Sequence, residues 1–196
     1  MPAGRPRVFD VDKALDAALE LFWRHGYEGT SLAMLTKAMG INTPSLYAAY
    51  GNKEALFGRV VEHYLQFPVS YMAQALAEPT ARRVAEQFLS GMIRLATHPD
   101  HPAGGCLLVR GALATGPTND PIRQQLSAIR SQGEAAMRTR FERAIEEGDL
   151  PTSADAAQLA RYLMTLNCGF SVQAAGGATH AQLEEIAQIA LRCWPT

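Results

Sequence analysis

The sequence predicts an all-α fold with about nine helices. Apolar residues recur at helical spacing along most of the 196 residues, whereas no stretch alternates with period two for long enough to indicate a β-strand. Glycine or proline separates the helical patterns, and a residue able to cap a helix precedes most of them. The chain is therefore long enough and regular enough to bury a helical core, in one domain or in two small ones.

The N-terminal region predicts a first helix over residues 11–25. Asp10 can cap it, because a side-chain oxygen at this position accepts an otherwise unpaired backbone N–H, and Gly26 ends it. A second helix begins at Thr30 or Ser31, either of which can act as its cap. Its buried face consists of apolar residues at helical spacing: Leu32, Leu35 and Met39.

A third, short helix follows a glycine turn. Gly40 ends the second helix in a left-handed conformation. Thr43 is the expected cap of the third, because Pro44 disfavours a helical Thr43 and has the φ of a first helical residue. Gly51 ends this helix after about two turns. Two short helices joined in this way are typical of a helix-turn-helix, whose second helix lies in the DNA major groove.

The segment Gly4-Arg5-Pro6-Arg7, before these helices, is polar and interrupted by proline. We interpret it as an arm in which Arg5 and Arg7 reach the DNA backbone or a narrow minor groove, whose negative potential attracts guanidinium groups. A plain disordered terminus is the alternative. The net charge of −1 gives no nucleic-acid signal, so a positive field must come from the local placement of basic residues.

Caps, glycines and prolines also delimit the remaining helices. Asn52 caps a helix that Pro68 kinks or interrupts near Phe67, because proline removes a backbone hydrogen bond and clashes with the preceding turn. The later helices are expected over residues 80–97, 106–114, from 119 or 120 to 147, from 153 or 155 to 175, and 179–193.

Several motifs at fixed spacing lie between Arg5 and Phe57. They are Phe22-Trp23-Arg24-His25-Gly26-Tyr27-Glu28, Thr30-Ser31-Leu32, Ser45-Leu46-Tyr47 and Gly51-Asn52-Lys53-Glu54-Ala55-Leu56-Phe57. This segment resembles the DNA-binding domain of TetR-type transcriptional repressors. The resemblance implies a helix-turn-helix DNA-binding domain over residues 1–52. It also implies a helical effector-binding and dimerisation domain over residues 53–196, where the similarity is mostly architectural.

The resemblance also implies which residues contact double-stranded operator DNA. Thr30 or Ser31 at one helix start and Lys53 at another would bind phosphates, because a helix N-terminus presents free N–H donors. Tyr47 would contact phosphate through its hydroxyl. The residues facing the groove would be Asn42, Thr43, Pro44, Ser45 and Ala48. Thr43 and Ala49 are small where many relatives have longer polar side chains. Recognition of the base sequence would therefore rely on hydroxyl groups, methyl contacts and DNA shape.

The C-terminal helices are expected to hold a small-molecule effector. A pocket should lie among the fifth to eighth helices, mostly apolar and with Asn167 or Arg110 as a polar contact. The other expected lining residues are Phe88, Met92, Cys106, Met137, Phe141, Tyr162 and Phe170. For each of these residues, a place in the plain hydrophobic core is the alternative.

The last two long helices have more apolar surface than one chain readily buries. Pairing them across a two-fold axis would form an isologous four-helix interface, and the protein would then be a homodimer. The alternative is that both are interior helices.

Three cysteines, Cys106, Cys168 and Cys193, have no metal-binding spacing and fit a reducing compartment. Cys106 follows two glycines at a helix start, with Arg110 one turn along, and such a setting lowers the pKa of a thiol. Some regulators of the resembled family have a similar Gly-Cys-Leu here, which favours sensing of oxidants or electrophiles. A buried Cys106 that acts as a small hydrophobic side chain is the alternative.

The sequence contains no Gly-rich phosphate-binding loop ending in Lys-Ser/Thr and no His-Glu-x-x-His, Cys-x-x-Cys or Gly-x-Ser-x-Gly motif. We expect no cofactor. It has no signal-peptide core and no apolar run long enough to span a bilayer, so we expect a cytoplasmic protein without membrane contact. These observations predict a homodimeric transcriptional regulator, most simply a repressor that a small molecule releases from a palindromic operator. A helical enzyme or small-ligand carrier without DNA binding is the alternative.

Overall fold

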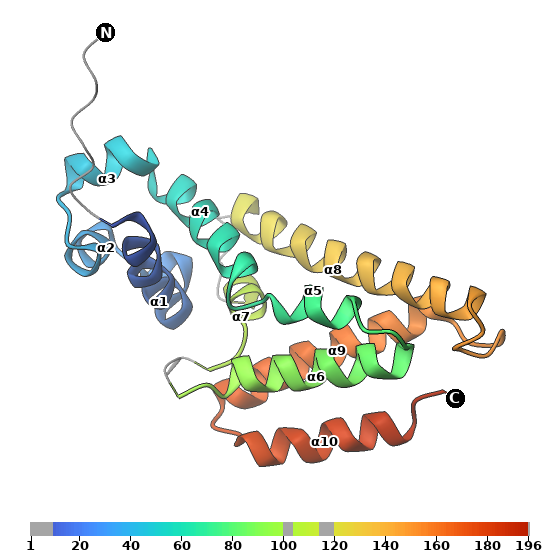
Figure 1. The fold of residues 1–196 in the computed structure, drawn as a ribbon. Coiled ribbons are helices and arrows are strands. Elements are labelled where there is room, and N and C mark those ends of the chain that lie inside the picture. The colour runs from blue at the N-terminus through green and yellow to red at the C-terminus, as the bar shows by residue number, and fades with distance from the viewer. Residues whose placement is uncertain (1–9, 100–103, 114–119, 196) are drawn as a thin grey trace, which may run out of the picture.

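The computed structural model describes residues 10–99, 104–113 and 120–195, and within these residues it contains ten α-helices and no strand (Figure 1). The helices are α1 (Val11–Gly29), α2 (Leu32–Met39), α3 (Thr43–Tyr50), α4 (Lys53–Gln66), α5 (Tyr71–Leu76), α6 (Ala81–Ala96), α7 (Leu107–Leu113), α8 (Asp120–Glu146), α9 (Ala156–Ala175) and α10 (His180–Arg192). Helices α1 to α4 lie at one end of the molecule, and α6, α9 and α10 are stacked at the other.

The sequence predicted about nine helices, and the tenth arises at the expected interruption. Helix α4 ends at Gln66, and Pro68 follows its C-cap residue Phe67. Proline has no backbone N–H with which to continue a helix. The chain therefore turns, and α5 begins separately at Tyr71.

Helix α1 is bent near its end by Gly26. This residue has φ 70° and ψ 176°, a backbone conformation that side chains other than glycine rarely adopt. At the other end, the Asp10 carboxylate accepts hydrogen bonds from the N–H groups of Asp12 and Lys13. The regular part of α1 thus begins and ends where the sequence predicted.

The core of the N-terminal helices continues into the C-terminal ones. The ring of Phe22 on α1 meets the edge of Phe57 on α4, with centroids 5.0 Å apart. Trp23 and Tyr64 form the same kind of contact at 5.1 Å. Tyr64 is fully buried, and its hydroxyl contacts Cys106 immediately before α7. One hydrophobic core therefore connects both ends of the molecule.

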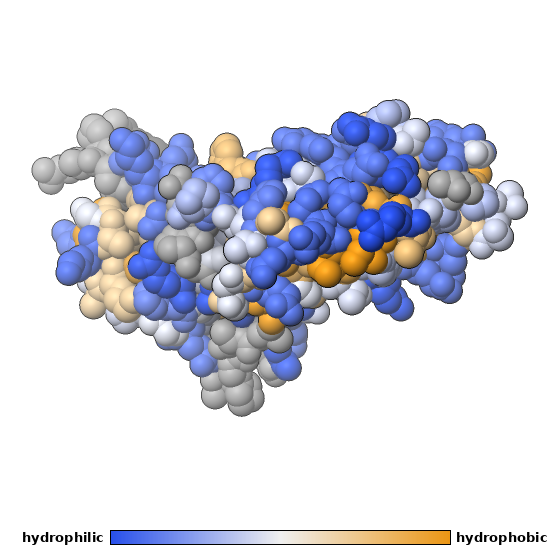
Figure 2. Space-filling model, turned by 90° about the horizontal axis from the view of Figure 1, so that it is seen from below, coloured by the Kyte–Doolittle hydropathy of each residue, from blue (hydrophilic) through white to orange (hydrophobic). Residues whose placement is uncertain are grey.

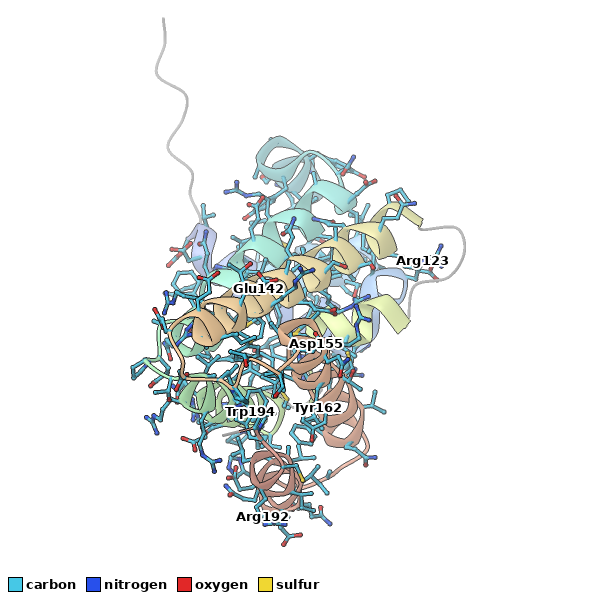
Figure 3. The ribbon with its side chains drawn as sticks, turned by 90° about the vertical axis from the view of Figure 1, so that its right-hand side faces the viewer. Arg123, Glu142, Asp155, Tyr162, Arg192 and Trp194 are labelled. Carbon is cyan, nitrogen blue, oxygen red and sulfur yellow. The ribbon has the colours of Figure 1, made fainter. Side chains whose placement is uncertain are left out.

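The C-terminal helices form layers around a second part of this core. Helix α8 packs along α9, and α6 packs against both α9 and α10 (Figure 1). Phe141 on α8 is fully buried, and its ring lies 5.4 Å from that of Trp194, which follows α10 and is labelled in Figure 3. The end of the chain thereby closes this part of the core.

Four large apolar side chains of α9 and α10 remain exposed. Tyr162 is 41% exposed, Val172 51%, Ile186 46% and Ile189 48%. Figure 2 shows an apolar patch on the face that includes α10. No helix in the described ranges is both long and apolar enough to cross a bilayer. An exposed apolar face of this kind is typical of a contact with another protein surface.

Candidate nucleic-acid interface and inner cavity

Helices α2 and α3 have the geometry of a helix-turn-helix. Ser31 caps α2, because its Oγ accepts a hydrogen bond from the N–H of Met34 at 3.2 Å. Gly40 ends α2 in the left-handed conformation, with φ 66°. The buried side chains of Leu35 and Leu46 attach the two helices to the core.

Helix α3 begins one residue earlier than the sequence predicted. Asn42, rather than Thr43, is its cap: Oδ1 of Asn42 accepts a hydrogen bond from the N–H of Ser45 at 2.8 Å. Thr43 is already helical, and Pro44 occupies the following position. Asparagine is the better capping residue of the two, and proline is tolerated throughout the first turn because those N–H groups have no helical acceptor.

Thr30 lies inside the protein, which corrects the expectation that its side chain binds a phosphate. It is 0% exposed, and its Oγ1 donates a hydrogen bond to the carbonyl of Gly26 at 2.7 Å. The hydroxyl therefore stabilises the connection between α1 and α2. Ser31, the next residue, is exposed and remains the candidate for this phosphate contact.

Lys53 is the first residue of α4. Asn52 caps this helix, as predicted, with its Oδ1 2.7 Å from the N–H of Ala55. The Nζ atom of Lys53 lies over the ring of Tyr27, 4.4 Å from the centroid. Burial lowers the pKa of Lys53, and the Glu28 carboxylate partly offsets this effect. The ring contact holds a positive charge beside a helix N-terminus, a position that favours anions.

The outer face of α3 is accessible to a ligand as large as DNA. Leu46 is the buried residue of this helix, and Ser45 is partly exposed. The exposed residues from its cap onward are Asn42, Thr43, Pro44, Tyr47 and Ala48. The expected arm residues Arg5 and Arg7 lie outside the described residues.

A cavity of about 70 Å³ lies between α5, α6, α7, α8 and α9. Its wall is mostly apolar, with contributions from Phe88 on α6, Ile129 on α8 and Met164 on α9. The polar groups at the wall include the guanidinium of Arg130 and the carboxamide of Asn167. A cavity of this composition is suited to a small and largely apolar molecule.

Comparison with known proteins identifies the family. Residues 14–60 match the bacterial regulatory proteins of the tetR family, and residues 81–189 match the tetracyclin repressor-like C-terminal domain. The chain is 36% identical to the HTH-type transcriptional repressor ComR of Escherichia coli (strain K12) over 194 residues, which are 98% of this chain and 92% of ComR. The chain belongs to the TetR family.

Solved TetR-family structures have the same architecture. A cysteine-substituted form of the TetR family transcriptional regulator CifR, complexed with 26-bp double-strand operator DNA, is 41% identical with a TM-score of 0.92. The match covers 97% of this chain and all of that one. A TetR transcriptional regulator from Chloroflexus aurantiacus J-10-FL is 22% identical, yet its TM-score is 0.81 over 92% of this chain and 91% of its own. The fold therefore persists where the sequences differ widely.

The inner cavity is lined by three of the residues that were expected to line it: Phe88, Cys106 and Asn167. The others are not among its lining residues, which corrects the prediction for Met92, Arg110, Met137, Phe141, Tyr162 and Phe170. Met92, Met137, Phe141 and Phe170 are buried in the core. Tyr162 is exposed, and Nη1 of Arg110 donates a hydrogen bond to the carbonyl of Gly104 at 3.2 Å.

Cys106 does not have the lowered pKa that its helix-start position predicted. It is 4% exposed, and burial raises the pKa of its thiol. A hydrogen bond from the Tyr64 hydroxyl, at 3.3 Å, only partly offsets this effect. The loss of solvation thus outweighs the hydrogen bonds from Tyr64 and from the backbone N–H groups of Leu108 and Val109, which lower the pKa. Cys106 therefore behaves as a small buried side chain at the cavity wall, which was the alternative reading of this residue.

The sequence did not indicate most of the cavity wall. Tyr71 and Met72 belong to α5, which has six residues and was interpreted as part of the preceding helix. Arg130 lies among many polar residues of α8, where nothing distinguished it from a solvated side chain. Elsewhere in the described ranges, no group of three or more His, Cys, Asp or Glu side chains is placed to hold a metal ion.

Proposed function

We propose that this protein is a dimeric repressor that binds operator DNA through α2 and α3 and leaves it when a small molecule occupies the inner cavity. The observation that carries the proposal is the exposed face of α3, flanked by the capped N-termini of α2 and α4. Helix N-termini bind phosphates, and an exposed helix between them is suited to the major groove. The similarity to CifR in complex with operator DNA supports this assignment.

The phosphate contacts in this proposal come from Ser31, Lys53 and Tyr47. Ser31 and Lys53 lie at the starts of α2 and α4, where backbone N–H donors add to the side chain. Tyr47 is 46% exposed, so its hydroxyl is free to reach the DNA backbone. Arg5 and Arg7 lie outside the described residues, and in this proposal their guanidinium groups contact a narrow minor groove.

The groove-facing residues in this proposal are Asn42, Thr43, Pro44, Ser45 and Ala48. All of them have short side chains, and Asn42 already uses its Oδ1 to cap α3. Direct base reading is therefore limited to short hydrogen bonds and to methyl contacts with thymine. Much of the remaining specificity comes from the shape and deformability of the operator.

The dimer in this proposal forms through α9 and α10. Each of these two helices has two exposed apolar side chains: Tyr162 and Val172 on α9, and Ile186 and Ile189 on α10. Tyr162 is labelled in Figure 3. A two-fold axis would pair the same two helices of each protomer in an isologous four-helix interface. The operator is then an imperfect palindrome whose half-sites are one helical turn apart, about 34 Å, or a multiple of it.

A gel-shift experiment with DNA from immediately upstream of the protein's own gene tests the proposed function. We expect sequence-selective binding that weakens as the salt concentration rises, because phosphate contacts displace counterions. Site selection from random DNA should return a palindrome. Absence of binding at any salt concentration would reject DNA binding and favour the carrier alternative, which the cavity alone also supports.

A further inference from the structure

Asn167 has a buried acceptor that the protein does not use. The residue is 7% exposed, and its Oδ1 has no hydrogen-bond partner among the described residues. Its side chain lines the inner cavity, in the middle of α9. Buried polar atoms in folded proteins are almost always paired, so an unpaired acceptor on a residue that lines a cavity indicates a missing donor.

Two polar groups at the cavity wall or directly behind it already have other partners. Nη1 of Arg130 donates a hydrogen bond to the carbonyl of Leu108 at 2.7 Å. The Tyr64 hydroxyl donates to the sulfur of Cys106, at 3.3 Å. No Asp or Glu is among the lining residues. The Tyr71 hydroxyl also lines the cavity, but it does not donate to Asn167. None of the described side chains of the wall therefore supplies the donor that Asn167 lacks, and a molecule in the cavity can supply it.

The charges at the wall argue for an uncharged molecule. The guanidinium of Arg130 repels a cation, and a cation would find no carboxylate on this wall. An anion would place its negative oxygen against Oδ1 of Asn167 and would lose its hydration to an otherwise apolar wall. A neutral hydroxyl group meets neither obstacle, because its O–H donates to Oδ1 and its oxygen needs no counter-ion.

The size of the cavity limits the length of this molecule. A dry apolar cavity of about 150 Å³ holds benzene, and this cavity is about 70 Å³, so it takes roughly three to five non-hydrogen atoms. Two flexible methionines, Met72 and Met164, line the cavity. Their ends meet beside Gly133, where an added Cβ would lie 3.1 Å from Cε of Met72 and 3.8 Å from Cε of Met164. Such side chains adapt their rotamers easily and allow modest expansion.

We propose that the inner cavity binds a short, neutral alcohol, with its hydroxyl donating to Oδ1 of Asn167 and its carbon chain against Phe88, Met72 and Met164. This inference rests on the proposed function in that it assigns a chemical class to the effector. Arg130 and Met164 also line a groove of about 270 Å³ on the outside of α8 and α9. The alcohol therefore enters between these two helices, past the Arg130 and Met164 side chains.

Ligand-observed NMR with 1-butanol as the probe tests the inference on the full-length protein. Its comparison ligand is 1-methoxypropane, an ether that has the same number of non-hydrogen atoms and no donor. We expect 1-butanol to bind at least about tenfold more tightly than the ether, because only the alcohol satisfies Oδ1. Butyrate and butylammonium should bind more weakly than 1-butanol. Equal affinities for the alcohol and the ether, or tighter binding of butyrate, would overturn the proposal.

The Asn167→Leu variant separates this role from a structural one. Leucine has a similar size and no unpaired acceptor, so the variant should be at least as stable as the original protein and should bind the alcohol and the ether equally. Ser131→Ala, which removes a hydroxyl from the outer groove only, should keep the preference for the alcohol. A marked loss of thermal stability in Asn167→Leu would mean that the Asn167 carboxamide already makes its hydrogen bonds within the folded protein. That result would overturn the proposal.

Operator binding measured on the same samples distinguishes the two proposals. If operator DNA binds but the alcohol has no preference over the ether, the ligand class is wrong and the repressor assignment stands. If the alcohol binds selectively but no operator is found, the ligand class stands and the repressor assignment is wrong. If both bind, 1-butanol should weaken operator affinity in the original protein and not in Asn167→Leu.

Discussion

The hydroxyl of Tyr64 donates a hydrogen bond to the sulfur of Cys106 at 3.3 Å. The same oxygen accepts the N–H of Leu107, the first residue of α7, at 3.2 Å. The Tyr64 ring also packs against Trp23 on α1. One buried side chain on α4 therefore contacts both the N-terminal helices and the wall of the inner cavity, where Cys106 lies. A molecule in the cavity would be sensed across this contact.

Tyr64→Phe should destabilise the protein by about 1–3 kcal/mol, because it leaves the buried N–H of Leu107 without an acceptor. Urea denaturation measures this loss. The variant should also reduce the effect of a cavity ligand on operator affinity, since α7 is then no longer attached to α4 through this hydroxyl.

Tyr71→Phe is the matched control. Tyr71 also lines the cavity, but its hydroxyl makes no hydrogen bond in the described part of the chain. Its removal should change the free energy of unfolding by less than about 0.5 kcal/mol. Equal losses in the two variants would show that the Tyr64 hydroxyl has no special role.

Stability should fall at alkaline pH. Burial raises the pKa values of Cys106, Tyr64 and Tyr71 in the folded protein, so these groups ionise more readily in the unfolded chain. Their contribution is complete below the unfolded thiol pKa of about 8.5 and is lost as the pH rises through the folded values, at up to about 1.4 kcal/mol per pH unit per group. Urea denaturation between about pH 7.5 and 10.5 covers the onset of this loss for the thiol, and the onset for the tyrosines at the upper end, because burial raises the pKa values of Tyr64 and Tyr71 well above their usual value.

Cys106→Ser should reduce this alkaline loss below about pH 10, where tyrosines begin to ionise, and leave only the contribution of the Cys168 thiol, whose pKa burial also raises. Cys193→Ser, at an exposed position, is the control and should leave the pH profile unchanged. Alkylation gives a second measurement: at neutral pH, Cys106 should react more slowly than the exposed Cys193. Fast alkylation of Cys106 near pH 7 would restore the redox hypothesis.

Lys53→Ala should weaken binding to all DNA sequences and reduce the salt dependence of binding by about one ion, because it removes one phosphate contact. Thr43→Ala should cost less affinity and relax discrimination at one base pair. Binding assays over a salt series, with the selected operator and with scrambled DNA, separate these effects. A changed base preference in Lys53→Ala, with an unchanged salt slope, would contradict the proposed contacts.

Gly91→Ala should destabilise the packing of α5 on α6. A Cβ at Gly91 would lie 2.5 Å from Cβ of Tyr71, and such overpacking costs about 1–3 kcal/mol. Gly58→Ala on α4 is the control: its nearest neighbour would be Nε2 of Gln125 at 3.8 Å. That substitution should stabilise the helix by about 0.5–1 kcal/mol, and thermal unfolding measures both.

Ile186→Glu should shift the protein toward the monomer and weaken operator binding, because it places a charge in the proposed interface. Phe67→Glu is the control, since Phe67 is 63% exposed at the end of α4, away from α9 and α10. Analytical ultracentrifugation measures the oligomeric state. A dimer that persists in Ile186→Glu would place the interface elsewhere.

Local signals allowed the N-terminal helices to be predicted almost residue by residue. Asp10, Gly26, Gly40 and Asn52 act where the sequence placed them, because a cap or a glycine turn depends on neighbouring residues only. The one-residue error at Asn42 arose where two good capping residues are adjacent.

Features that depend on tertiary contacts were harder to predict. The cavity wall combines side chains from several helices, so no local pattern marks Arg130 or Met72 as neighbours. Cys106 was misjudged for the same reason. Its helix start is visible in the sequence, whereas the burial that controls its pKa comes largely from distant helices, including Tyr64 on α4.

Because the helix is interrupted at Pro68, α4 can rotate about that end as a rigid unit, and its other end carries the DNA-binding helices. Its 14 residues span about 21 Å. A swing of about 10° at the Pro68 end would move Lys53 by about 4 Å, and the opposite swing in a two-fold partner would bring the relative displacement to about 7 Å. That is roughly a fifth of the ~34 Å between half-sites one turn apart. A rotation of α4 by about 10° is thus enough to take the two copies of α3 out of register with successive major grooves of the operator.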